Sequence, residues 1–135
     1  MAASLCGAAV VVCLSVLTSC DESPTGPTVP LNADFVLAPG NVAMIDEASL
    51  AIRFNGVTGD SRCPADVVCV QGGDAIVSVT ATSSRGARDY ELHTGNMQPV
   101  RHDEVTIALV QLSPYPFSSG PIAPNDYRAT LRVTR

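Results

Sequence analysis

Hydrophobic and polar residues alternate along most of the chain from Asp34 onward. In the clearest stretch, residues 50–55, Leu50, Ile52 and Phe54 alternate with smaller or polar residues. A period of two is typical of a β-strand with one buried face. The same pattern predicts seven strands, at residues 35–37, 42–45, 50–55, 75–81, 89–93, 105–109 and 127–133.

Turn-forming residues separate these stretches, as Pro39-Gly40-Asn41 does between the first two. Because the strands follow one another without helical patterns between them, antiparallel sheets are favoured over alternating strand and helix units. We expect an all-β domain at residues 34–135, a small antiparallel β-sandwich of the immunoglobulin-like kind, with a small β-barrel as the alternative.

The N-terminal segment has a different pattern. Residues 8–17 are apolar or small, with only Cys13 and Ser15 interrupting them. A helical membrane span needs about twenty residues, so this run has the length of a signal-peptide core instead. Leu17-Thr18-Ser19-Cys20 follows and resembles the lipobox of bacterial lipoproteins. The resemblance implies a signal peptide at 1–19 and a Cys20 that carries acyl chains such as palmitate.

A lipidated Cys20 would hold the mature protein on the extracytoplasmic side of a membrane of the bacterial cell envelope, because several acyl chains on one residue anchor firmly. Residues 20–33 contain Pro24, Pro27 and Pro30 among polar residues and predict an extended tether. At about 3 Å per residue, such a tether would lift the domain by about 35 Å.

Two further cysteines, Cys63 and Cys69, remain once the signal peptide is removed and Cys20 is acylated. In an oxidising compartment, two cysteines so close in sequence are expected to form a disulfide. Closing this short loop would contribute about 2 kcal/mol to stability. The spacing differs from the C-x-x-C of thioredoxin-like redox sites.

The residues around these cysteines carry a second resemblance. Asp60-Ser61-Arg62-Cys63-Pro64, with Cys69 and Gly73, resembles a motif that recurs in uncharacterised secreted lipoproteins of bacteria. Leu112-Ser113-Pro114-Tyr115-Pro116 and the strand around Tyr127 are similar to the same proteins. The resemblance implies a shared fold and no particular activity.

The composition excludes several classes of function. The net charge is −5, and lysine is absent from the chain. Nucleic acids and anionic lipid surfaces attract clustered basic residues, so we expect neither as an electrostatic partner. No G-x-S-x-G nucleophile motif is present. We therefore expect a protein that is not an enzyme and that needs no cofactor.

Two sets of residues are candidates for binding. Asp60 and Arg62 are two positions apart, so on an extended segment they project to one side and either brace the loop or form an exposed recognition point. Residues 113–126 predict a long loop, where Tyr115 and Phe117 either bind a partner or fold back onto the sandwich.

Other chemistry has weaker support. His93, Met97 and His102 lie near one predicted turn and offer donors that suit copper, although exposed turn residues are the simpler interpretation. A loop closed by Cys63 and Cys69 could also act as a protease inhibitor. The sequence favours a membrane-anchored binding or structural module of the envelope, whose partner is an unknown envelope or extracellular protein.

Overall fold

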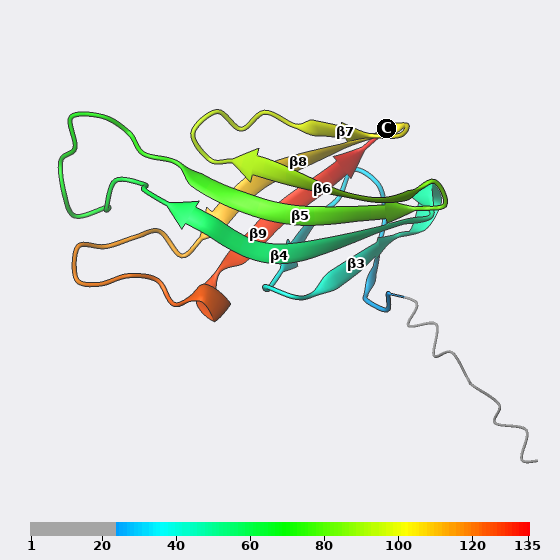
Figure 1. The fold of residues 1–135 in the computed structure, drawn as a ribbon, viewed down its shortest axis with the longest axis horizontal. Helices are drawn as coiled ribbons and strands as arrows, with labels where there is room; N and C mark the ends of the chain where they lie inside the picture. Colours follow the sequence, from blue (N-terminus) through cyan, green and yellow to red (C-terminus); the bar gives the residue numbers. More distant parts are fainter. Residues whose placement is uncertain (1–23) are drawn as a thin grey trace, which may run out of the picture.

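Two β-sheets form the fold in a computed structural model, which describes residues 24–135 (Figure 1). The predicted signal peptide and Cys20 lie outside these residues. The first sheet has the order β1 (Thr28–Val29), β3 (Val42–Ile45), β4 (Leu50–Asp60), β5 (Ala75–Ser83), β6 (Gly86–His93). The second has the order β2 (Asp34–Leu37), β9 (Arg128–Thr134), β8 (Val105–Ser113), β7 (Val100–His102). Two single-turn helices, η1 (Asp46–Ala48) and η2 (Pro124–Asp126), lie between strands.

The predicted sandwich is confirmed, and the sheets do not close into a barrel. Strands β3 to β6 follow one another as antiparallel neighbours, and so do β7 to β9. The chain changes sheet three times, between β1 and β2, between β2 and β3, and between β6 and β7. Most neighbours are therefore consecutive in sequence, which is why period-two stretches separated by turns predicted the architecture.

The core lies between the two sheets and is built from the alternating residues. In β5, the side chains of Ala75, Val77 and Val79 are fully buried, and those between them are partly exposed. Phe54 of β4 is the largest fully buried side chain. Burying a side chain of this kind contributes about 1.5–3 kcal/mol, so the alternation fixes which face of each strand points inward.

The prediction of an extended tether at residues 20–33 is wrong for its C-terminal part, which joins the domain. Thr28 and Val29 form β1, which pairs in parallel with β3, and Val29 and Leu31 pack against the core. Gly26 lies so close to Val42 that a Cβ there would be 1.9 Å from the Val42 carbonyl oxygen. The prolines suggested a spacer up to residue 33, but two apolar side chains suffice to add this segment to the domain.

The short strand β7 was not predicted either. It has three residues and pairs only with the start of β8. An alternation of apolar and polar residues cannot be recognised over so few positions.

The two ends of the sandwich differ. Figure 1 shows the chain entering the domain at the end that also carries η1 and the C-terminus, while three long connections project from the opposite end. We call these connections the distal loops: residues 61–74 between β4 and β5, 94–99 between β6 and β7, and 114–127 between β8 and β9. No helix within residues 24–135 is long and apolar enough to cross a membrane.

Candidate functional site

Loop 61–74 contains the predicted disulfide, which the structure confirms. Cys63 and Cys69 are bonded, with their Cα atoms 6.0 Å apart. The bond closes a short ring within loop 61–74. Constraining this ring limits the conformations open to the loop.

Next to the ring, Arg62 and Asp60 form a buried ion pair. Arg62 Nε donates to Asp60 Oδ1 at 2.9 Å, and Nη2 donates to Oδ2 at 2.7 Å. The two side chains are 5% and 12% exposed. This two-point geometry is the strongest arrangement of a guanidinium and a carboxylate, and it offsets the cost of removing both charges from water.

The same guanidinium reaches across to the end of β8. Arg62 Nη1 donates to the carbonyl oxygen of Leu112 at 3.0 Å, and Nη2 donates to that of Pro114 at 3.0 Å. The ring of Tyr115 lies with its centroid 5.3 Å from the guanidinium carbon, within range of a cation–π contact. Arg62 thus fixes loop 61–74 to the start of loop 114–127.

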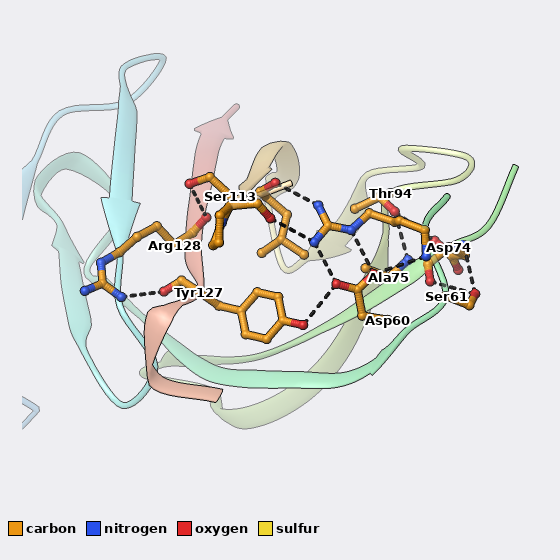
Figure 2. A network of polar contacts seen from close by, with 11 residues as sticks. Asp60, Ser61, Asp74, Ala75, Thr94, Ser113, Tyr127 and Arg128 are labelled. Carbon is orange, nitrogen blue, oxygen red and sulfur yellow. Dashed lines mark hydrogen bonds and ion pairs between the residues drawn. The ribbon is translucent and has the colours of Figure 1, made fainter. Parts of the chain in front are cut away.

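Tyr127 completes this network at the end of loop 114–127. Its hydroxyl donates to Asp60 Oδ2 at 3.0 Å (Figure 2). Burial alone would raise the pKa of Asp60, but the hydrogen bonds from Arg62 and Tyr127 outweigh it and lower the pKa below its usual value. Burial and the bond to Asp60 raise the pKa of Tyr127. We call Asp60, Arg62 and Tyr127 the arginine brace.

The tips of the same two loops are joined separately. The Asp66 carboxylate accepts hydrogen bonds from the Ser118 backbone N–H, at 2.8 Å, and from the Ser118 hydroxyl. Ala65 N–H donates to the Pro116 carbonyl at 2.9 Å. The hydrogen bonds from Ser118 lower the pKa of Asp66, because they stabilise the ionised carboxylate.

Asp74 ties loop 61–74 to loop 94–99. Its carboxylate pairs with His93 Nδ1 at 2.5 Å and accepts hydrogen bonds from the Gly95 N–H at 2.8 Å and the Thr94 hydroxyl at 3.2 Å. The contact with His93 lowers the pKa of Asp74. Loop 61–74 is therefore bonded to both of the other distal loops.

The base of loop 61–74 is closed by contacts between Ser61 and Asp74. The Ser61 N–H and hydroxyl donate to the Asp74 carbonyl at 2.7 and 3.0 Å (Figure 2). Gly73 allows this approach, because a Cβ on it would lie 1.5 Å from the Ser61 carbonyl oxygen. Only glycine fits there without moving the backbone.

Exposed apolar side chains gather on these loops. Among residues 24–135, every large hydrophobic side chain that is exposed, apart from Val36, belongs to them. Val68 and Val70 are as exposed as in an extended chain, at 99% and 103%. We call this set the apolar loop surface; its members are Val67, Val68, Val70, Met97, Tyr115 and Phe117.

The structure thus separates the two binding candidates of the sequence. It buries Arg62 and uses its donors within the protein, which supports the interpretation of Asp60 and Arg62 as a brace. Tyr115 and Phe117 are 53% and 55% exposed and do not fold back into the core. The sequence pointed to the loop between Cys63 and Cys69 as a place for binding, but not to Val68 or Val70 themselves, because two valines in a loop have no distinctive spacing.

The histidines proposed for copper lie in separate hydrogen-bonding groups. His93 pairs with Asp74, whereas His102 Nδ1 lies 3.0 Å from the Tyr90 hydroxyl. His102 Nε2 is buried without a hydrogen bond, 3.5 Å from an Asp103 oxygen. Within residues 24–135, no three His, Cys, Asp or Glu residues are grouped as a metal site would need.

Comparison with known proteins adds no relative: no family model matches the chain, and no curated protein or solved structure gives a significant match. The function of the domain must therefore be inferred from the geometry of its distal loops.

The first prediction concerns the arginine brace and pH. At pH 7, Asp60→Asn should lower the free energy of unfolding by about 2 kcal/mol, because it leaves the Arg62 charge buried and unpaired. Since the native pKa of Asp60 is lowered, its ionised form stabilises the fold above the unfolded pKa, and this contribution is lost as pH falls through the native pKa. The difference between the two proteins should therefore shrink below about pH 4 in urea unfolding.

Asp126→Asn is the matched control, because the Asp126 side chain makes no ion pair within the described part of the chain. It should leave stability unchanged at both pH values. A stability gap for Asp60→Asn that is absent at pH 7, or that does not change with pH, would contradict the role of the brace.

The second prediction concerns the base of loop 61–74. Gly73→Ala should destabilise the protein by about 2 kcal/mol or more, because the added methyl group overlaps the Ser61 carbonyl. Gly72→Ala, where a Cβ meets nothing within 4 Å, should have little effect. Thermal unfolding measures both, and equal melting temperatures for the two variants would disprove the close approach.

Proposed function

We propose that this chain is a lipid-anchored lipoprotein of the bacterial cell envelope, and that its domain is a non-enzymatic module that binds another protein through the apolar loop surface. The observation that carries the proposal is that the large exposed apolar side chains of residues 24–135, except Val36, all belong to three loops at one end of the domain, of which loop 61–74 is hydrogen-bonded to both of the others. Soluble proteins seldom expose such groups together unless they contact a partner.

The anchor in this proposal comes from the lipobox, and two features support it. The disulfide between Cys63 and Cys69 suits an oxidising compartment outside the cytosol. Gly26 is already packed against Val42, so only about six peptide units separate Cys20 from the domain. At no more than about 3.6 Å per residue, these units would hold the domain within about 20 Å of the membrane.

The position of the loops fits a module that faces away from its anchor. The chain enters the domain at one end, and the distal loops project from the other (Figure 1). A partner in front of the membrane could then reach the loops without passing the anchored end. Because the disulfide and the links between loops hold the surface in shape, little conformational freedom would be lost on binding.

Charge favours a protein partner over a lipid or nucleic-acid partner. Arg62 is the only basic residue of the distal loops, and its charge is paired with Asp60. Anionic lipids and nucleic acids bind through unpaired basic side chains. Burying Val68 and Val70 against an apolar protein surface would instead contribute about 25 cal/mol for each Å² removed from water.

The third prediction tests this binding in cells. A photo-cross-linking amino acid at the exposed position of Ser119, in loop 114–127, should yield a discrete protein adduct in intact cells. Val68→Asp combined with Val70→Asp should reduce that adduct by about tenfold or more, because charged groups would have to be desolvated at the interface. Immunoblotting for the adduct is the measurement.

Val36→Asp is the control, because Val36 is 58% exposed but lies on β2, away from the loops. It should leave the adduct unchanged. Cys20→Ser in the same cells tests the anchor and should move the protein out of the membrane fraction. An adduct that is equally strong in all loop and control variants would refute the binding surface.

A second candidate function is protease inhibition, which the exposure of Val68 inside a disulfide-closed ring favours. An inhibitor loop presents one side chain to the specificity pocket of a protease in a fixed conformation, and a valine suits the small pocket of elastase-type enzymes. The fourth prediction is that the oxidised protein inhibits such an enzyme and that both reduction and Val68→Asp abolish inhibition. Intact inhibition after reduction, or none before it, would exclude this candidate.

A further inference from the structure

Strand β8 has an edge that its neighbour covers only in part. β8 spans Val105–Ser113, whereas β7 pairs only with its residues 105–107. On its other side, β9 pairs with β8 along almost its whole length. Within residues 24–135, no strand pairs with residues 108–113 on the β7 side. We call residues 108–111 the open edge.

The local sequence explains why β7 begins only at Val100 and so does not reach residues 108–111 of β8. Pro99, directly before β7, has no N–H to donate to a neighbouring strand. Before it, the chain forms a tight turn in which Met97 has φ 49° and its N–H donates to the His93 carbonyl at 3.0 Å. Loop 94–99 therefore does not continue the line of β7 alongside β8.

Of the usual protections against strand addition, the open edge has only a β-bulge, between Leu109 and Gln111 in the pairing of β8 with β9. Edge strands are commonly guarded by charged side chains, by proline or by their short length. Ala108, Leu109, Val110 and Gln111 include neither a charge nor a proline. By contrast, the outer strand β6 carries charged residues at Arg88, Asp89 and Glu91, and β2 has only four residues, one of them Asp34.

A groove of about 280 Å³ lies beside this part of β8. Val110 and Gln111 line it together with Met97 of loop 94–99 and Tyr115 of loop 114–127. At the end of the groove, the carbonyl oxygen of Leu112 already accepts a hydrogen bond from Arg62 Nη1. The groove is therefore bounded by the arginine brace and includes two members of the apolar loop surface.

We propose that an extended segment of the partner protein adds as a strand to β8 at residues 108–111, in continuation of β7. This inference rests on the proposed function and specifies how the partner is recognised. Backbone groups of the added strand would pair with β8, and alternate side chains would enter the groove between Met97 and Tyr115. At about 3.3 Å per residue, the open edge accommodates about four residues.

The lining of the groove defines the chemistry of that segment. Its one charged group, Arg62, is paired with Asp60 and bonded to the Leu112 and Pro114 carbonyls. A charged side chain entering the groove would find no free counter-ion there. The preferred segment therefore carries an apolar side chain at the central position and no proline among the paired residues.

The fifth prediction uses a phage-displayed library of linear peptides as the probe for the purified, oxidised protein. The enriched peptide should slow amide hydrogen exchange in residues 108–111 by about tenfold or more. An analogue that is N-methylated at the residues of the paired edge should lose binding, because it cannot donate to β8. Val110→Lys and Met97→Asp should each weaken binding about tenfold or more.

Val36→Lys is the matched control, since it places the same charge on the opposite edge strand of the same sheet. It should bind the peptide as the unaltered protein does. Peptides that bind the Val110→Lys variant equally well, protection that maps elsewhere on the protein, or failure to enrich any peptide would overturn strand addition. Dimerisation through the open edge, seen by light scattering, would identify a second copy as the occupant and overturn it too.

The outcome is separable from that of the proposed function. If the cellular adduct depends on Val68 and Val70 but no peptide protects the open edge, the partner binds the loop tips without adding a strand. If the adduct is absent while the peptide binds, the open edge binds a strand and Val68 and Val70 play no part in recognition.

Discussion

The buried ion pair between Arg62 and Asp60 is the interaction on which the distal end of the protein depends. A guanidinium withdrawn from water needs several acceptors, and it finds them in one carboxylate and two carbonyl groups from a separate part of the chain. Asp60 is the last residue of β4, and Tyr127 directly precedes β9. Through its bonds to Leu112, Pro114 and Tyr127, the pair therefore connects the ends of strands from both sheets at the base of the distal loops.

Much of the fold was predictable, because the free energy of burial imposes a period of two on strands that line the core along their whole length, such as β5 and β9. Leu50, Ile52 and Phe54 at the start of β4 follow the same rule, since all three are buried as the pattern required. The disulfide was predictable from the small number of cysteines. Strands β1 and β7 could not be predicted, because an alternation of apolar and polar residues cannot be recognised over two or three positions.

The site was predictable only where its parts are close in sequence. Asp60 and Arg62 were candidates for a pair because they are two positions apart. Their bonds to Leu112, Pro114 and Tyr127 span fifty positions or more and leave no local pattern. The exposure of Val68 depends on how the whole loop is held, so a valine of a type that usually forms cores is fully solvated in the structure.

The C-terminus lies at the same end of the sandwich as the point where the chain enters (Figure 1). A fluorescent protein or affinity tag fused after Arg135 would therefore extend from the end remote from the three connecting segments. Such fusions leave those segments unobstructed, whereas an insertion near Val68 would occupy them. The position of the C-terminus thus makes this domain suited to labelling without disturbing the distal loops.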